Sequence, residues 1–300
     1  MNTPIVYASS RLLNITPQNL PKRDLERSVL MVTPENYDVR YVINPHMEGK
    51  IGSVNKERAV VQWKSLVRAY ESIGLRVEQI SSVPEFPDMV FCANQSFPFR
   101  DQHGDLSVII SRMASHYRQG EEAYFDVWYQ QHGYRVIRQI EPPVEFEGMG
   151  DVLWHPRRKL LYAGYGYRTH KSALSRLANC VGCPVVGLEL VHPSFYHLDT
   201  AFAPLSENTA LYVEEALTSE GIAMLHKCFS NLVKVPLDEA MNGFVTNGHC
   251  PDGIHFIVNK GNEETKYLVS ELGFKVIEVD TSEFIKAGGS VFCLKMMLPT

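Results

Sequence analysis

Residues 263–279 have the sequence EETKYLVSELGFKVIEV, in which a helical pattern, a glycine and a β-rich run follow one another directly. Because glycine is typical of a helix C-terminus, Gly273 predicts that a helix ends at 272 and that a strand follows at 274–279. Three such units of helix, glycine and short strand predict an α/β protein but leave its topology open. The other two lie at 55–70, Gly74 and 75–80, and at 119–132, Gly133 and 134–140.

Shorter β-rich runs and one further helical run separate these units. No phosphate-binding glycine motif follows them, and Gly164-Tyr165-Gly166 lacks the third glycine of a dinucleotide site, so nucleotide binding is not expected. The expected strands are 39–44, 106–110, 160–163, 211–213, 233–235 and 254–258, and the expected helix is 171–179.

The composition is ordinary for a globular protein of 300 residues, with 45% hydrophobic and 21% charged residues. No run approaches the roughly 18 apolar residues of a membrane span. A net charge of -5 without a basic patch argues against nucleic acid as a partner. The first 23 residues lack the apolar core of a secretory signal, so we expect a cytoplasmic protein. They also lack acidic residues, as transit peptides do, but a leading arm of the domain is the first expectation.

Six cysteines are spread along the chain and, without a secretory signal, are expected as free thiols. Cys180 and Cys183 form a C-x-x-C pair. A zinc site would need a second close pair, and only two His/Cys pairs, at 226/228 and 249/250, are available. Because Cys183 precedes an apolar run that predicts a buried strand, we expect packing thiols here rather than a metal site.

Five polar or glycine-rich islands interrupt the expected elements, and loops on a rigid scaffold commonly carry catalytic groups. The last island, 286–294, has two glycines that let the backbone approach a ligand, followed by Cys293. Considered alone, Cys293 fits a core thiol on a terminal strand better than a nucleophile. In the island 195–200, His197 and Asp199 would face one space in an extended segment, although a structural His–Asp pair has the same pattern.

The other three islands supply acids and amides. The island 145–151 holds three acids and two glycines, which fits either a site loop or a solvated acidic turn. The apolar run 87–94 is expected as a strand with Asp88 at its start, and 41–47 as a strand that ends in a polar loop. Together the islands provide a thiol, an imidazole, carboxylates and amides, the inventory for thiol attack on an electron-poor carbon in a planar cation.

In their order along the chain, these islands resemble motifs of the guanidino-group-modifying enzymes of the pentein superfamily, above all the arginine dihydrolase and arginine deiminase-related group. The likeness begins near Met31, which leaves 1–30 as an N-terminal extension and 31–300 as a single catalytic domain. It implies a pentein fold, an α/β propeller of five ββαβ-like units with pseudo-fivefold symmetry. The motifs I-N-P-W-M, P-D-M-V-F-T-A-N-A-G, E-G-x-G-D, F-Y-H-L-D-T and K-A-G-G-x-x-x-C-L correspond to 43–47, 87–94, 147–151, 195–200 and 286–294.

The resemblance also implies a role for each matched residue. Cys293 would be the nucleophile and His197 the general acid/base, with Glu147 orienting the imidazole or binding a substrate nitrogen. No cofactor and no metal would be needed, because the guanidinium supplies its own electrophilicity. The residues implied to bind substrate are Asp199 at the guanidinium, Arg112 and Arg168 at the α-carboxylate, and Asn44, Asn94, Asp88 and Asp151 around it.

Asn94 stands where deiminases and dimethylarginine hydrolases tend to have aspartate. A neutral amide binds a neutral ureido group more readily than a carboxylate does, so we expect citrulline to be retained and hydrolysed again. The motifs also depart from the family pattern at His46, Cys92, Phe292 and Lys295, which affects the prediction of the substrate more than that of the chemistry.

The sequence therefore predicts hydrolysis of arginine or a close analogue through a covalent thiouronium, with a small guanidino molecule as partner and a homo-oligomer as a possible assembly. An arginine dihydrolase, which yields ornithine, ammonia and CO2, is the first expectation. The alternatives are an arginine deiminase, a dimethylarginine or citrulline hydrolase, an amidinotransferase, and a non-catalytic binding protein on the same scaffold. Some dihydrolases carry a C-terminal domain, and because nothing follows Thr300 we expect the first activity alone.

Overall fold

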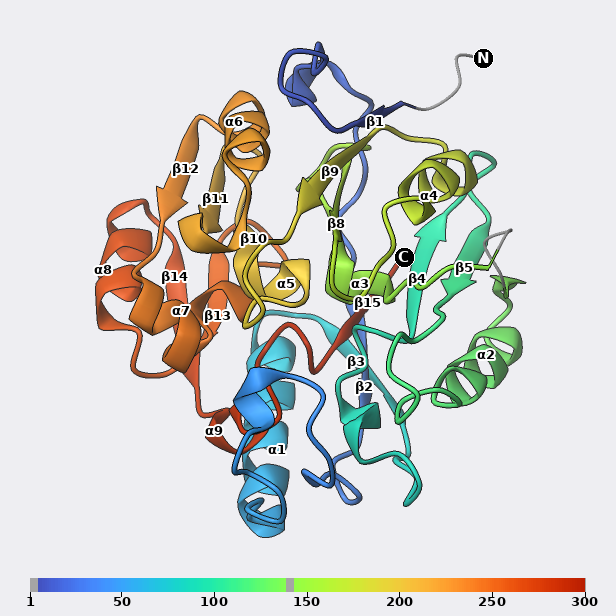
Figure 1. The fold of residues 1–300 in the computed structure, drawn as a ribbon, viewed down its shortest axis with the longest axis vertical. Coiled ribbons are helices and arrows are strands. Elements are labelled where there is room, and N and C mark those ends of the chain that lie inside the picture. Colours follow the sequence, from blue (N-terminus) through green and yellow to red (C-terminus); the bar gives the residue numbers. More distant parts are fainter. Residues whose placement is uncertain (1–4, 139–142, 300) are drawn as a thin grey trace.

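The strands of the computed structural model form five small sheets within the described residues, 5–138 and 143–299 (Figure 1). Each sheet contains one pair of parallel strands joined by a helix, a βαβ crossover. The five crossovers are β2 (Ser28–Val32), α1 (Lys56–Ser72) and β3 (Arg76–Ile80); β5 (Leu106–Ile110), α2 (Glu122–Gln131) and β6 (Arg135–Ile137); β8 (Leu161–Tyr165), α4 (Ala173–Val181) and β9 (Val185–Glu189); β11 (Thr209–Tyr212), α6 (Ser219–Cys228) and β12 (Asn231–Lys234); and β13 (His255–Asn259), α8 (Glu263–Glu271) and β14 (Lys275–Val279).

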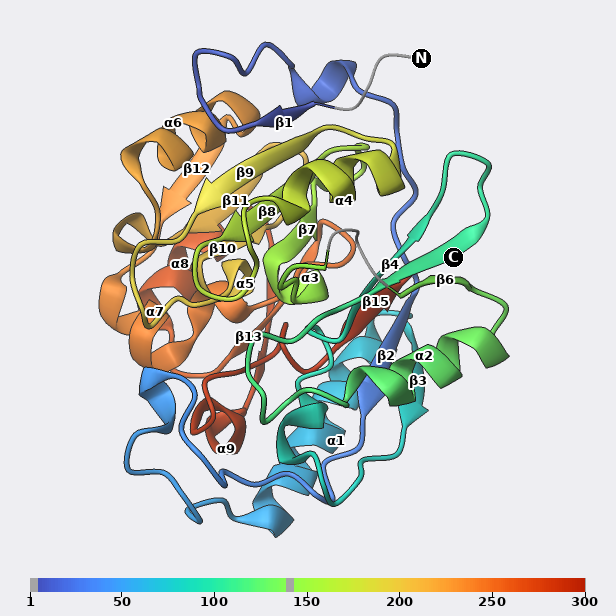
Figure 2. The same ribbon diagram turned by 45° about the vertical axis from the view of Figure 1, so that its right-hand side comes forward.

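An antiparallel strand lies on the other side of the first parallel strand in four of these sheets. It is β4 (Ser96–Arg100) beside β5, β7 (Val152–Trp154) beside β8, β10 (Phe202–Pro204) beside β11, and β15 (Met296–Leu298) beside β2. In the fifth sheet a single bridge from His249 to Ile257 takes this place. Because β15 comes from the C-terminal end and β2 from the N-terminal part, the two ends of the domain close one sheet, as Figure 2 shows.

Short helices or turns precede these antiparallel strands and carry polar side chains toward the middle of the molecule. Figure 1 places α3, α5 and β15 at the centre, with the five sheets around them. The helices and turns are η3 (Pro87–Val90), α3 (Gly148–Asp151), α5 (Leu198–Ala201), η5 (Val245–Asn247) and the turn 291–294. The remaining elements are β1 (Val6–Tyr7), η1 (Pro17–Asn19), η2 (Pro45–Met47), η4 (Glu214–Ala216), α7 (Leu237–Gly243) and α9 (Ser282–Ile285).

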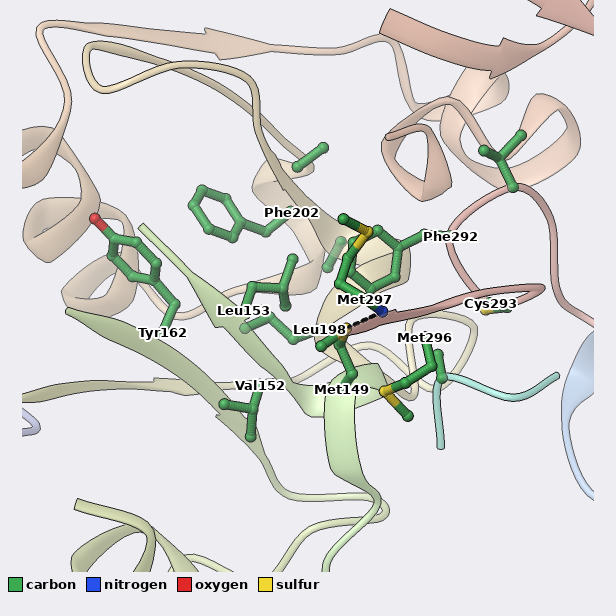
Figure 3. Close-up of a cluster of buried hydrophobic side chains, with 14 of the residues drawn as sticks. Met149, Val152, Leu153, Tyr162, Leu198, Phe202, Phe292, Cys293, Met296 and Met297 are labelled. Atoms are coloured by element: carbon green, nitrogen blue, oxygen red, sulfur yellow. Dashed lines mark hydrogen bonds between the residues drawn. The ribbon is translucent and has the colours of Figure 1, made fainter. Parts of the chain in front are cut away.

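Apolar side chains fill the space between the central helices and the sheets. Figure 3 shows Met149, Leu198, Phe202 and Phe292 in one buried cluster, contributed by three different units. Burying each large apolar side chain contributes roughly 1.5–3 kcal/mol, so this shared core fixes the central loops. The N-terminal segment joins it from outside, where β1 pairs in parallel with β9.

The three predicted units of helix, glycine and strand are confirmed as α1–β3, α2–β6 and α8–β14. Gly74, Gly133 and Gly273 all have positive φ, which is the conformation that favours glycine after a helix. The predicted helix 171–179 is α4, and the predicted strands from 106 onward correspond to β5, β8, β11, β12 and β13. Residues 139 and 140 of one predicted strand lie outside the described residues.

Two predicted strands are wrong. Residues 39–44 form a loop, because their backbone has no neighbouring strand to pair with and is held by local contacts such as Gly52 N donating to Val39 O. Residues 87–90 form η3 rather than a strand, because Pro87 starts a tight turn in which Phe91 N donates to Asp88 O. The five repeated units agree with the expected ββαβ-like form, while pseudo-fivefold symmetry and the boundary at residue 30 stay predictions.

Candidate active site

A small pocket lies at the centre, among the loops that precede the antiparallel strands. It brings together residues from four of the five predicted islands and from two segments that carry arginines. The described residues that line it are Ile43, Asn44, Asp88, Phe91, Asn94, Arg118, Arg168, Tyr196, His197, Ala287, Gly288, Gly289 and Cys293.

Cys293 lies in the turn before β15, and its side chain is buried. Its Sγ is 3.1 Å from Oδ2 of Asp199 and 3.2 Å from Nδ2 of Asn247. Burial, and then the negative charge of Asp199, raise the pKa of this thiol well above its usual value. The resting group is therefore a neutral thiol that needs a cation nearby before it ionises.

Two glycines allow the loop before Cys293 to pack tightly against the pocket. At Gly288, where φ is +86°, a Cβ would lie 2.6 Å from the hydroxyl of Tyr196. At Gly289 a Cβ would lie 2.4 Å from the ring of Phe91. Side chains at either position would push the loop 286–293 away from the pocket, which explains the glycine pair seen in the sequence.

His197 and Glu147 form a buried pair in which Nε2 of the imidazole is 2.6 Å from Oε2 of the carboxylate. Burial alone would raise the pKa of Glu147, but the charge of Arg168 and the bond to His197 lower it to about 2. A carboxylate that stays ionised fixes the tautomer and the direction of the ring. The other ring nitrogen, Nδ1, faces Asn94 Nδ2 at 3.5 Å and is the one available for proton transfer.

Asp88 and Asp199 each have a buried Oδ1 with no hydrogen-bond partner among the described residues. Burial raises the pKa of both carboxyl groups, that of Asp199 to about 7. Buried polar atoms are nearly always paired in a working complex. Two unpaired carboxylate oxygens, one on Asp199 beside the thiol and one on Asp88 in the pocket lining, are therefore suited to the N–H groups of a cationic ligand.

Arg118 fixes the orientation of Asn94. Its Nη1 donates to Asn94 Oδ1 at 2.8 Å, and its Nε and Nη2 donate to Glu121. Because the amide oxygen is occupied, the NH2 of Asn94 is the end that faces His197 and the pocket. Sequence reasoning missed Arg118, since an arginine three residues before a glutamate is also the pattern of an exposed helix pair.

Arg168 and Asn44, both predicted to bind substrate, line the pocket. Nη2 of Arg168 donates to Ile43 O at 2.8 Å, and its guanidinium lies 5.0 Å from the ring centroid of Tyr196. Asn44 donates through Nδ2 to Ala287 O at 3.0 Å and accepts from His46 N. These contacts hold the loop 43–47 against the loop 286–293 and place one cationic side chain at the pocket.

Three predicted substrate-binding residues do not line the pocket: Asp199, which contacts the sulfur of Cys293, Arg112 and Asp151. Arg112 is exposed, because its backbone pairs with Phe146 and its neighbours on either side are buried, so the alternation of an extended segment turns it outward. Both carboxylate oxygens of Asp151 are already occupied, one by Thr169 Oγ1 at 2.6 Å and one by Leu198 N at 3.0 Å. Asp151 therefore joins α3 to α5 behind the site.

Within the segment 195–200, His197 has an extended backbone and caps α5, which begins at Leu198. His197 and Asp199 therefore do not share a face by strand alternation as the sequence predicts. His197 lines the pocket, as Cys293 does, whereas Asp199 contacts the sulfur of Cys293 directly. Sequence reasoning also missed Asn247, because Asn-Gly in a polar stretch is typical of an ordinary turn.

The Cys180/Cys183 pair lies away from the pocket, on α4 and just before β9, and all six cysteines are free. Within residues 5–138 and 143–299, no group of three or more His, Cys, Asp and Glu side chains is arranged to hold a metal ion. In the same residues, no helix has the length and apolar character needed to cross a membrane.

A family model described as "N,N dimethylarginine dimethylhydrolase, eukaryotic" matches residues 42–299. The chain belongs to this family. It is therefore a DDAH-like pentein and a hydrolase that acts on amidine C–N bonds. This result confirms the resemblance to the guanidino-group-modifying enzymes that the motifs indicate.

Several relatives cover nearly all of the chain. The bifunctional arginine dihydrolase/ornithine cyclodeaminase ArgZ of Synechocystis sp. is 36% identical over 270 residues, 89% of this chain but 37% of that protein. The solved N-terminal domain of ArgZ, bound to substrate, has a TM-score of 0.84 and 35% identity over 92% of this chain and 98% of that one. An N(G),N(G)-dimethylarginine dimethylaminohydrolase of Mycobacterium tuberculosis is 34% identical over 96% of this chain and 90% of its own length. The chain spans 37% of the length of the two bifunctional relatives, ArgZ and AgrE.

Lys295, two residues after Cys293, is fully buried without a carboxylate partner among the described residues. Its Nζ lies 3.0 Å from the ring centroid of Phe292 and 3.8 Å from Sδ of Met149, both members of the cluster in Figure 3. Burial lowers the pKa of this amine to about 7. An amine in such surroundings costs stability, because folding disfavours its charged form.

We expect Lys295→Met to raise the free energy of unfolding by about 1–3 kcal/mol at neutral pH. Since the folded pKa of about 7 lies below the unfolded value, the cost of Lys295 is absent above about pH 10.4, grows as the pH falls, and is complete below pH 7. Urea unfolding at pH 6, 8 and 10 measures the gain, with the exposed Lys275→Met as control. A gain that does not shrink toward pH 10 would contradict this account.

Proposed function

We propose that the protein is an arginine dihydrolase, in which Cys293 attacks the guanidino carbon and arginine is converted to ornithine, CO2 and two ammonia. We also propose that its five units form the pentein propeller with pseudo-fivefold symmetry. The observation that carries the choice of activity is the hydrogen bond from Arg118 to Asn94 Oδ1, which leaves an amide donor facing the pocket. The relatives ArgZ and AgrE, which are both named as arginine dihydrolases, support this choice of activity.

In the first half of the reaction, the guanidinium donates to the unpaired carboxylate oxygens of Asp88 and Asp199. Its positive charge offsets the effect of Asp199 on the thiol and lowers the thiol pKa. The thiol proton passes to His197, the sulfur bonds to the guanidino carbon, and His197 then protonates the nitrogen that leaves as ammonia. The C–N bond breaks and a thiouronium remains on Cys293.

Water completes this half. His197, held by Glu147, takes a proton from a water molecule as its oxygen bonds to the thiouronium carbon. The C–S bond then breaks, the sulfur regains a proton, and the carbon is left as the ureido group of citrulline. The guanidinium of Arg168, which lines the pocket, is suited to hold the α-carboxylate throughout.

Asn94 decides what happens to citrulline. A ureido group presents a carbonyl oxygen, which needs a hydrogen-bond donor, and the NH2 of Asn94 is that donor. With its oxygen polarised, the ureido carbon accepts the sulfur of Cys293 a second time. Ammonia leaves with a proton from His197, and water releases a carbamate that decays to ornithine and CO2.

The second candidate is hydrolysis of dimethylarginine, which the family match and the Mycobacterium tuberculosis relative favour. It uses the same residues but releases dimethylamine and leaves citrulline.

Product analysis separates arginine dihydrolysis from dimethylarginine hydrolysis. We expect two ammonia for each ornithine, no accumulated citrulline, and turnover of citrulline supplied alone. Accumulation of citrulline with one ammonia would contradict the proposal, as would faster release of dimethylamine from dimethylarginine than of ammonia from arginine.

Asn94→Asp is expected to stop the reaction at citrulline. The carboxylate cannot donate to a ureido oxygen, so ornithine formation should fall at least about tenfold while ammonia is still released from arginine. Chromatography of citrulline and ornithine over a time course measures the ratio. Asn208→Asp, which adds the same charge at an exposed position, should leave the ratio unchanged. Unaltered ornithine formation in Asn94→Asp would contradict the role of this amide.

A further inference from the structure

Asn247 is the last residue of η5 and its side chain is fully buried. Its Oδ1 accepts from the backbone N–H of Ser290 at 2.9 Å and of Cys293 at 3.2 Å. Its Nδ2 donates to Asp199 O at 3.0 Å and to Sγ of Cys293 at 3.2 Å. Because two backbone N–H groups occupy the oxygen, the amide cannot flip, and an N–H must point at the sulfur.

The N–H of Asn247 and the carboxylate of Asp199 have opposite effects on the Cys293 thiol. The carboxylate, at 3.1 Å from the sulfur, raises the pKa of the Cys293 thiol, whereas the bond from Asn247 lowers it. Among the described residues, Asn247 is the side chain with a hydrogen bond donated to this sulfur. A bond that is weak to a thiol becomes charge-assisted once the thiol ionises, so it favours the thiolate over the thiol.

We propose that Asn247 is a catalytic residue whose side-chain amide stabilises the thiolate of Cys293 and fixes the direction from which its sulfur meets the carbon under attack. The proposal rests on the proposed role of Cys293 as nucleophile. One of these contacts reaches the sulfur and two hold the backbone of the loop that carries Cys293, so both electrostatic and positioning effects pass through one amide.

Asn247→Asp separates the two effects. The new carboxylate can still accept from the N–H groups of Ser290 and Cys293, so the loop keeps its support. It cannot donate to the sulfur, and its charge opposes the thiolate. We expect kcat/KM to fall by about 10²- to 10³-fold and the pH profile of the rate to move to higher pH.

The deciding readout is alkylation of Cys293 by iodoacetamide across pH without substrate, quantified on the peptide that contains residue 293. We expect the apparent thiol pKa to rise by at least about one unit in Asn247→Asp. Asn247→Ser, which keeps a short donor, should lie between the wild type and Asn247→Asp. It also provides the test if the aspartate variant does not fold, since its alkylation profile should still shift upward from that of the wild type.

Asn262→Asp is the matched control. Its amide is also buried and also donates to backbone carbonyls, those of Gly243 and Asn259, but it has no contact with the sulfur. Its alkylation profile should be that of the wild type. An unshifted profile in folded Asn247 variants would overturn the proposal. Because alkylation uses no guanidino substrate, a wrong substrate assignment would alter the product analysis and leave this result intact.

Discussion

Cys293→Ser is expected to reduce hydrolysis of arginine by at least about 10⁴-fold while the fold survives. A serine hydroxyl can donate to Asp199 and accept from Asn247 as the thiol does, so little stability should be lost. At neutral pH, however, it does not ionise beside a carboxylate, and no thiouronium can form. Ammonia release under saturating arginine measures the rate, and circular dichroism with thermal melting verifies the fold.

The matched control for this variant is Cys183→Ser. Cys183 is as buried as Cys293, each with 3% of its surface exposed, but it lies before β9 and away from the pocket. It should retain wild-type activity, apart from any effect of lowered stability. If Cys293→Ser kept the wild-type rate, the assignment of the nucleophile would be wrong, whatever activity Cys183→Ser shows.

His197→Ala is expected to reduce turnover of arginine by about 10³- to 10⁴-fold. Without the imidazole, no group returns a proton to the leaving nitrogen, and none activates water afterwards. Glu147→Gln should have a smaller effect, because an amide still bonds to the ring but no longer stabilises its charged form. Initial rates of ammonia release measure both variants.

The exposed His170→Ala serves as control for this series and should leave the rate unchanged. The order of effects matters more than any single rate. A loss in Glu147→Gln as large as that in His197→Ala would contradict the smaller, orienting role of Glu147. A His197→Ala variant within tenfold of the wild type would remove His197 from the mechanism.

Much of the site could be predicted because its residues lie in contiguous motifs. His197, Glu147, Asn94 and Cys293 each sit in an island whose pattern differs from that of the surrounding strands and helices. Their convergence could not be predicted, because it depends on pairings between distant segments, such as β15 with β2. The antiparallel strands β7, β10 and β15 have three residues each, too few for a periodic signal.

The errors have local physical causes. Arg112 and Arg118 lie six residues apart, and only the alternation around 112 and the buried pair with Glu121 show which one reaches the pocket. Asp151 belongs to a matched motif, but its oxygens bind Thr169 and Leu198, contacts between segments that no motif reveals. Asn247 lies in the fifth unit, in which a single bridge takes the place of the antiparallel strand. No strand pattern in the sequence therefore marks the turn that carries Asn247.

The central claim is that Cys293 forms a covalent bond to the guanidino carbon and that His197 is needed to complete the cycle. S-Methyl-L-thiocitrulline tests it directly, because methanethiolate leaves without a proton from a general acid. In His197→Ala, the thiol can still pass its proton to Asp199, which its sulfur contacts at 3.1 Å, so attack should occur while hydrolysis of the adduct should not. Mass spectrometry should therefore find the amidino adduct on the peptide that contains Cys293. No adduct there, or an adduct on another cysteine with Cys293 unmodified, would contradict the account.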